Sequence, residues 1–223
     1  TLIDTREDIA TSCNYALATH GYRTLRTEVI SRYVGDGSRR LCARAAGLTE
    51  RDAELDPLVE TFVNHYAEHP LIHTAWLPDA QQVLDAMRPL PLALCTNKPR
   101  IVTERVLEGL GVRSRFAVVV GGGDTPKPKP SKEPIMLVAE RLRLDPHELV
   151  MVGDGPQDVL AGKATGCRTI SLAGGYSTKA QLRECHPDIL LDSIKDVPQI
   201  VARWCESTVR ARCLPQETGP VSR

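Results

Sequence analysis

The 223-residue sequence lacks a surplus of charge of either sign, because 28 lysines and arginines balance 28 aspartates and glutamates. A balanced chain exerts no general attraction on nucleic acid or on an anionic membrane, so we expect neither as a partner. The sequence also lacks an apolar run near the ~18 residues of a membrane span, and no basic-then-apolar leader opens it. These absences predict a soluble, cytoplasmic protein.

The sequence has no Cys-x-x-Cys pair, although it contains seven cysteines. An odd number of widely scattered cysteines argues against a disulfide framework and against a zinc site. We therefore expect reduced thiols, which agrees with a cytoplasmic location.

Two patterns of apolar residues divide the chain. The first third shows helical periodicity without strands, whereas the remainder alternates short apolar runs with helical stretches. Such alternation is typical of βαβ units, and near-continuous apolar strands indicate a sheet covered on both faces. The sequence predicts an α/β fold: a doubly wound, mainly parallel, Rossmann-like sheet with an inserted helical cap domain.

The predicted domain boundaries follow this change of pattern. Residues 1–6 and 78–204 should form the Rossmann-like core, with its first strand largely absent, and residues 7–77 the helical cap. The segment Thr5-Arg6-Glu7-Asp8 at the start of the cap has the pattern of a capping box. Residues 205–223 lose periodicity and gain Pro, Gly and charged residues, so we expect a disordered tail.

Polar side chains stand where the predicted strands end, and ligands of doubly wound sheets bind at the carboxyl ends of strands. One apolar run ends in Thr96-Asn97, and another ends in Gly153-Asp154 with Asp158 close behind. Lys129 lies between them in a proline-rich segment that should be extended. A hydroxyl, an ammonium and two carboxylates can together hold a phosphoryl group and a hard cation.

Simpler roles are open for several of these residues. Thr96 could merely satisfy a strand end, and Lys129 could be an ordinary solvated lysine. Asp154 is harder to explain structurally, because a carboxylate after an apolar strand needs a partner. The segment Gly35-Asp36-Gly37 fits both a helix–helix turn and a loop that touches substrate.

In chain order, these segments resemble the four motifs of the haloacid dehalogenase-like hydrolase superfamily. Thr1-Leu2-Ile3-Asp4-Thr5 is similar to the end of the first motif, Asp-x-Asp-Gly-Thr-Leu-x-Asp-Ser/Thr. Thr96-Asn97 resembles the second, and Lys129-Pro130 the third, with Lys132 in place of a proline. Residues 153–158 match the fourth, Gly-Asp-x-x-x-Asp.

Further segments resemble the phosphoglycolate phosphatase branch over about residues 1 to 200. They are Tyr33-Val34-Gly35-Asp36-Gly37 followed by Arg39 and Arg40, then Gly122-Gly123-Asp124-Thr125, and Gly174-Gly175-Tyr176. The resemblance implies a magnesium-dependent phosphomonoester hydrolase acting on a small phosphorylated metabolite, 2-phosphoglycolate first among them. It is compatible with a monomer or a homodimer.

The resemblance also implies roles for matching positions. Thr96 and Lys129 would be catalytic, Thr96 binding the phosphoryl group and Lys129 offsetting its charge. Asp154 and Asp158 would serve the magnesium ion, Asp154 directly or through water and Asp158 in support. Asp4 would cap a helix. The implied substrate-binding residues are Thr96, Asn97, Lys129, Gly35, Arg39 and Arg40, with the two arginines meeting a carboxylate.

The family's nucleophile is the first Asp of the first motif, which forms an aspartyl-phosphate, and the second Asp is the general acid and base. Both positions precede Thr1 in this sequence. We therefore expect the chain beginning at Thr1 to be catalytically silent. An alternative is a non-catalytic relative that keeps the phosphate pocket for binding or regulation.

Overall fold

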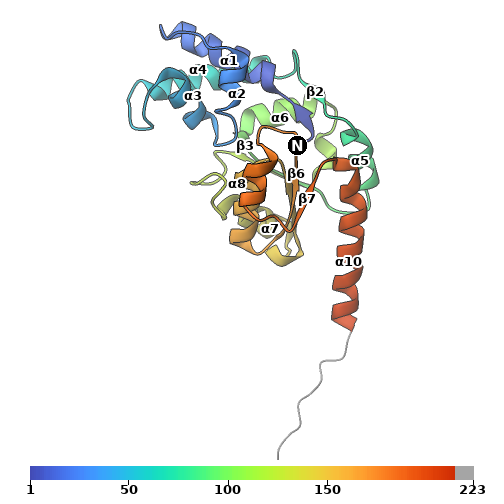
Figure 1. Cartoon of the computed structure of the whole chain (residues 1–223). Coiled ribbons are helices and arrows are strands. Elements are labelled where there is room, and N and C mark those ends of the chain that lie inside the picture. The colour runs from blue at the N-terminus through green and yellow to red at the C-terminus, as the bar shows by residue number, and fades with distance from the viewer. Residues whose placement is uncertain (214–223) are drawn as a thin grey trace, which may run out of the picture.

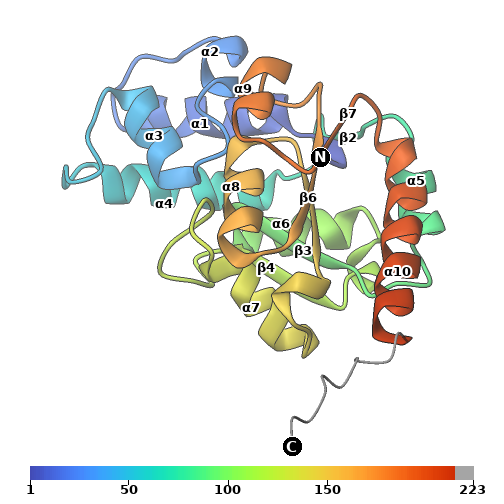
Figure 2. The same cartoon turned by 60° about the horizontal axis from the view of Figure 1, so that its bottom comes forward.

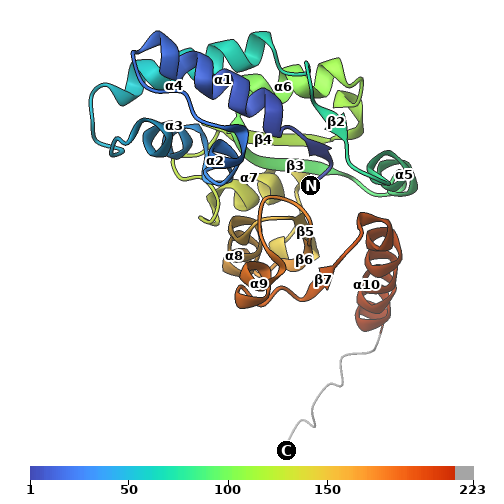
Figure 3. The same ribbon diagram turned by 45° about the horizontal axis from the view of Figure 1, so that its top comes forward.

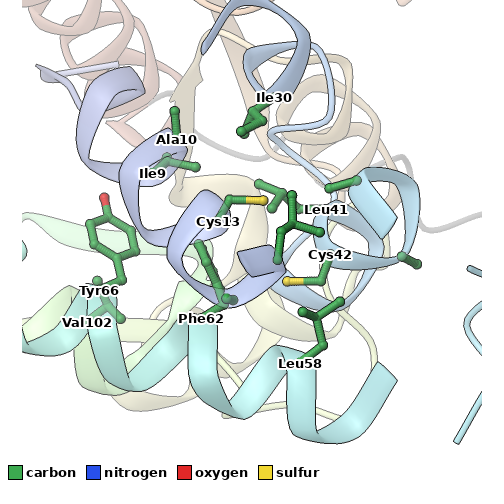
Figure 4. Packing of buried hydrophobic residues seen from close by; sticks show 14 of the residues in the cluster. Ile9, Ala10, Cys13, Ile30, Leu41, Cys42, Leu58, Phe62, Tyr66 and Val102 are labelled. Carbon is green, nitrogen blue, oxygen red and sulfur yellow. The ribbon is translucent and has the colours of Figure 1, made fainter. Parts of the chain in front are cut away.

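Four helices form the first part of the chain in the computed structural model, which describes residues 1–213 and only the backbone of residues 207–213. They are α1 (Arg6–Thr19), α2 (Thr27–Ser31), α3 (Ser38–Ala46) and α4 (Leu55–Glu68) (Figure 1). Both α1 and α3 pack against α4, and buried Cys13, Leu58, Phe62 and Tyr66 fill the space between the helices (Figure 4). Val102 of helix α6 (Arg100–Gly109) belongs to the same cluster, which connects the helical segment to the α/β part.

Two short strands bracket this helical segment. Strand β1 (Ile3–Asp4) pairs antiparallel with β2 (Ala75–Trp76), so that Ile3 lies opposite Trp76. The chain therefore enters and leaves the helical segment at one place, as an inserted domain requires.

Five strands form the α/β part, in two parallel groups. Strand β3 (Ala93–Pro99) pairs with β4 (Val118–Gly122), and β5 (Val150–Gly153) with β6 (Arg168–Leu172), which pairs with β7 (Ile189–Leu191). The helices between and around them are α5 (Ala80–Ala86), α6 (Arg100–Gly109), α7 (Glu133–Leu142), α8 (Pro156–Thr165), α9 (Lys179–Glu184) and α10 (Val197–Cys213). Short 3₁₀ turns lie at Arg113–Arg115, Pro146–Glu148 and Ile194–Asp196.

Helices cover both faces of the strands, so the predicted fold class is confirmed. In β4, Val119 packs with Leu107 of α6, whereas Val118 and Val120 pack with Val138 of α7. In the second group, α8 packs on one side of β6 and α10 on the other (Figure 2). Burial on both faces explains why these strands read as continuous apolar runs.

The two groups of strands are separate sheets without ladder hydrogen bonds between them, and Figure 3 shows β3 and β4 apart from β5, β6 and β7. Between them lies a cavity of about 710 Å³. Its apolar wall includes Leu92 and Leu94 from the β3 side and Val150 and Val152 from β5. The polar strand ends described below line the same cavity.

Two sequence predictions need correction. The capping box at Thr5 is wrong: the side chain of Thr5 makes no capping bond and lies 3.2 Å from the hydroxyl of Tyr176. Asp8 is buried and accepts the N–H groups of His73 and Thr74 instead, at 2.9 and 2.8 Å. Asp4 accepts the N–H of Arg6 at 3.1 Å, which satisfies a donor at the start of the helix.

The predicted tail also begins too early, because α10 continues to Cys213. Its first turns pack Val197 and Val201 against the sheet, and the guanidinium of Arg168 lies over the Trp204 ring. Once its first turns are anchored by this packing, the helix continues to Cys213. The rest of the predicted tail lies outside the described residues. No described helix has the length and apolar character needed to cross a bilayer.

Candidate active site

The polar strand ends predicted from the sequence meet at one cavity. Thr96 and Asn97 lie in the last part of β3, Asp154 directly follows β5, and Asp158 lies in the first turn of α8. Lys129 comes from the loop before α7, and all five residues line the cavity. The carboxyl ends of β3 and β5 both open on this cavity, as in a doubly wound fold, although the two strands belong to separate groups.

Lys129 and Asp158 form a buried ion pair. The Lys129 Nζ donates to Asp158 Oδ1 at 2.7 Å and to the carbonyl oxygen of Cys95 at 2.5 Å. Lys129 is only 5% exposed and Asp158 only 6%. Burial lowers the pKa of Lys129, but the Asp158 carboxylate outweighs it, so the net pKa is raised and the side chain is an ammonium at neutral pH.

Asp158 has both carboxylate oxygens engaged by the protein. One accepts from Lys129, and the other accepts the N–H of Gly155 at 3.0 Å. This carboxylate therefore positions Lys129 and closes the first turn of α8. The predicted support of a metal ion by Asp158 would be indirect, through the loop that carries Asp154.

Asn97 ties three segments together. Its Nδ2 donates to the carbonyl oxygens of Gly35 and Lys129, each at 2.9 Å, and its Oδ1 accepts the N–H of Lys129 at 2.9 Å. The amide thus links the end of β3 to the helical segment and to the lysine loop. With both amide atoms in use, Asn97 is arranged to hold Lys129 and Gly35 in place.

Thr96 keeps its hydroxyl hydrogen free. The Oγ1 accepts the N–H of Lys98 at 3.2 Å, and no acceptor for its own hydrogen occurs among the described residues. A hydroxyl held in this way at a cavity wall can donate to an anionic oxygen.

Asp154 supplies the carboxylate that a cation would need. Its Oδ1 accepts the Thr1 hydroxyl at 2.5 Å and lies 3.0 Å from the Thr1 amino group. Burial alone raises the pKa of Asp154, but the charge of the amino group and the hydrogen bonds from Thr1 and Tyr176 hold it below its usual value. The carboxylate is therefore ionised.

The donor set around Asp154 fits magnesium with help from a substrate. The described residues contain no group of three potential metal ligands. Magnesium is usually held by one or two carboxylates, with waters and substrate phosphate oxygens completing its shell. A single ionised carboxylate beside a cavity that can hold a phosphate meets that requirement, and Asp154 is the residue that would provide it.

Of the three substrate-binding residues predicted in the helical segment, one lines the cavity and two do not. Gly35 lines the cavity, and its backbone φ of 126° suits a glycine. Arg39 instead pairs with Asp56, and Arg40 with Glu50 at 2.9 Å. Arg39 is 43% exposed, and neither arginine lines the cavity in the structure.

Sequence reasoning missed Lys98 as a candidate. It directly follows Thr96-Asn97, and its Nζ donates to the Tyr66 hydroxyl and lies 4.2 Å from the centre of the Tyr66 ring. Burial lowers the pKa of Lys98 to about 7, against a smaller opposing effect of the Asp8 charge. In the sequence, a single lysine after an apolar run resembles a surface residue. Its position two residues after Thr96 was the one feature that could have identified it.

Comparison with known proteins places this geometry in a family. Residues 1–172 match the family model of the haloacid dehalogenase-like hydrolases. A phosphoglycolate phosphatase from Chromobacterium violaceum is 37% identical over 204 residues, covering 88% of this chain and 90% of its own length. One from Neisseria meningitidis is 31% identical over 207 residues, covering 88% of each chain.

Solved structures agree with the sequence relatives. The crystal structure of a predicted phosphoglycolate phosphatase from Haemophilus somnus superposes with a TM-score of 0.79 at 25% identity, covering 90% of this chain and 93% of that one. A predicted phosphatase from Clostridium acetobutylicum has the same fold, with a TM-score of 0.80 at 17% identity, covering 91% and 94%. This chain belongs to the haloacid dehalogenase-like hydrolases, in the phosphoglycolate phosphatase branch.

Proposed function

We propose that this protein is a magnesium-dependent phosphatase of a small phosphorylated acid, 2-phosphoglycolate. The observation that carries the proposal is the meeting of Lys129, the free Thr96 hydroxyl and the ionised Asp154 at one cavity. The relatives named phosphoglycolate phosphatase, which match most of the chain, support the choice of substrate.

The chain's own residues would hold the phosphoryl group from several sides. Thr96 donates its hydroxyl hydrogen to a phosphoryl oxygen, and the Lys129 ammonium offsets the negative charge there. Asp158 and Asn97 keep Lys129 in place through its ammonium and its backbone. Asp154 would hold the magnesium ion, whose charge stabilises the phosphoryl oxygens when it is bound.

The cavity also suggests where the family's catalytic aspartates would enter. The β3 and β5 edges face the cavity with apolar side chains and are not paired with one another. An apolar strand between them would complete the sheet and would end beside Thr96 and Asp154. We place the attacking carboxylate and the general acid and base at the end of such a strand.

The helical segment would act as the predicted cap, residues 7–77. Its Gly35 loop accepts a hydrogen bond from Asn97 at the cavity, and Tyr66 of α4 contacts Lys98. A lid at this position excludes water and large phosphoesters, which favours small metabolites. The exposed Arg39 and Arg40 would contact substrate only after leaving their partners Asp56 and Glu50.

The test is an assay of phosphate release from a panel of small phosphate esters, using a form extended ahead of Thr1 by an apolar strand ending in Asp-x-Asp-Gly. We expect magnesium-dependent hydrolysis with 2-phosphoglycolate among the best substrates. Full activity in the presence of a chelator would refute the metal assignment. A panel in which 2-phosphoglycolate is among the poorest substrates would refute the substrate assignment.

A further inference from the structure

Lys98 presents to the cavity a basic side chain that has no charged partner among the described residues. It is partly buried and lines the cavity, yet among the described residues no carboxylate lies within salt-bridge distance of its Nζ. Asp8 is the carboxylate whose charge acts on the pKa of Lys98. Its oxygens already accept hydrogen bonds from the N–H groups of His73 and Thr74 and from the Thr74 hydroxyl. Buried charges are normally paired, and a buried lysine without an anionic partner at a binding cavity is where an anion would bind and stabilise the ammonium.

The surroundings of Lys98 hold its ammonium at the boundary between cap and core. The Tyr66 hydroxyl accepts from Nζ, and the Tyr66 ring lies under the charge. Thr5 and Tyr176 line the cavity with Tyr66 and lie 3.2 Å apart. The Tyr66 hydroxyl and ring therefore orient the amino group without neutralising it, and Thr5 and Tyr176 add polar groups to the same cavity.

The backbone of Lys98 lies next to the proposed phosphoryl site, and its side chain lines the same cavity. The backbone N–H of Lys98 donates to Thr96 Oγ1, so the two residues are in direct contact. The phosphoryl end of a ligand would be bound by Thr96 and Lys129, and its other end would lie within reach of the Lys98 side chain. The other candidates for this role, Arg39 and Arg40, are committed to carboxylates at the surface.

We propose that Lys98 is the carboxylate-binding residue for the substrate, and that Tyr66 positions its ammonium from the cap. This assignment rests on the proposed function, because it takes the second anionic group of the ester to be a carboxylate. An ester that carries only a phosphoryl group leaves Lys98 unpaired. Specificity for a phosphorylated acid then follows, since a site built for a charged group discriminates strongly against analogues that lack it.

The test compares two esters that differ at one group. In 2-hydroxyethyl phosphate, the carboxylate of 2-phosphoglycolate is replaced by a hydroxymethyl group. Calorimetric titration with magnesium present gives the Kd of each for the Thr1–Arg223 chain and for Lys98→Met. We expect wild type to prefer 2-phosphoglycolate, and Lys98→Met to reduce this preference by about tenfold or more.

Two further variants separate recognition from structure. Lys179→Met removes a surface lysine paired with Asp192 and should leave both Kd values within about twofold of wild type. Tyr66→Phe keeps the ring but removes the acceptor of Lys98, and should reduce the preference less than Lys98→Met does. Equal weakening of both esters in Lys98→Met would mean a structural role and would overturn the inference.

The outcome also distinguishes this inference from the proposed function. A wild-type preference for 2-phosphoglycolate that survives in Lys98→Met overturns the role of Lys98 and leaves the function standing. A wild-type chain that binds neither ester, while the extended form hydrolyses neither, overturns the function and the inference with it.

Discussion

Neutralising Asp158 should destabilise the fold strongly. Lys129 is 5% exposed, and Asp158 is its ion-pair partner at 2.7 Å. The change Asp158→Asn keeps an oxygen that can accept the N–H of Gly155, so it removes the charge with little other disturbance. Leaving one member of a buried pair without its partner costs about 3–5 kcal/mol, a large share of the roughly 5–15 kcal/mol by which domains are stable.

The opposite change should cost less. In Lys129→Met, the Asp158 carboxylate keeps the N–H of Gly155 and lies in the first turn of α8, where the helix dipole favours negative charge. The loss should therefore be about 2 kcal/mol, typical of a hydrogen bond to a charged group. Because the net pKa of Lys129 is raised, the pair should persist through neutral pH and weaken only as the pH rises above the usual range of lysine.

Urea unfolding of the two single variants and the double variant measures both effects. A drop of 3–5 kcal/mol for Asp158→Asn corresponds to a melting temperature lower by ~6–20 °C in a chain of this size. The exposed pair Lys179–Asp192 is the control, and removing either member should cost under about 1 kcal/mol. Losses below ~1 kcal/mol at both buried positions, with no coupling between them, would refute the reasoning.

Three further changes test the site. Asp154→Asn in the extended form should abolish magnesium-dependent phosphate release, and undiminished turnover would contradict its role as a ligand. Lys98→Met should raise the melting temperature at pH 7 by a few °C, because it removes a buried ammonium. With a pKa of about 7 in the folded chain, wild type should gain stability from pH 7 to 10 and the variant should not, which melting curves across that range check. Extension by an apolar strand ending in Asp-x-Asp-Gly should raise the melting temperature and switch on activity together, and a gain of neither would contradict the placement of that strand.

The sequence was sufficient to predict the fold class and the convergence of the polar strand ends, but not Lys98 or the positions of Arg39 and Arg40. Apolar strands alternating with helices allow few arrangements, and parallel strands bring Thr96 and Asp154 to the same cavity. What each side chain does there depends on partners far along the chain. The spacing of Asp154 and Asp158 suggests one shared cation, yet Asp158 faces Lys129, 29 residues away in sequence.

Predictions from local sequence patterns were wrong where a residue distant in sequence bound the side chain in question. The Thr5–Asp8 capping box was outweighed by His73 and Thr74, which satisfy the buried Asp8 carboxylate from 65 and 66 residues away. Lys98 was overlooked for the same reason, since its contact Tyr66 is 32 residues earlier. Short-range spacing carries no information about such contacts, whereas the cost of burying a charge without a partner is what requires them.

The charges around the cavity explain why a metal ion and a substrate should depend on each other. Of the described residues that line the cavity, Lys129 is paired with Asp158, whereas Asp154 and Lys98 have no oppositely charged side chain as a partner. A phosphorylated acid brings about two negative charges on its phosphoryl group and one on its carboxylate. At the phosphoryl end, Lys129 is already paired with Asp158, so its charge offsets only part of that of the phosphoryl group. A divalent cation at Asp154 would supply further positive charge there. The carboxylate end would have only Lys98, whose partner in the protein is the uncharged Tyr66 side chain.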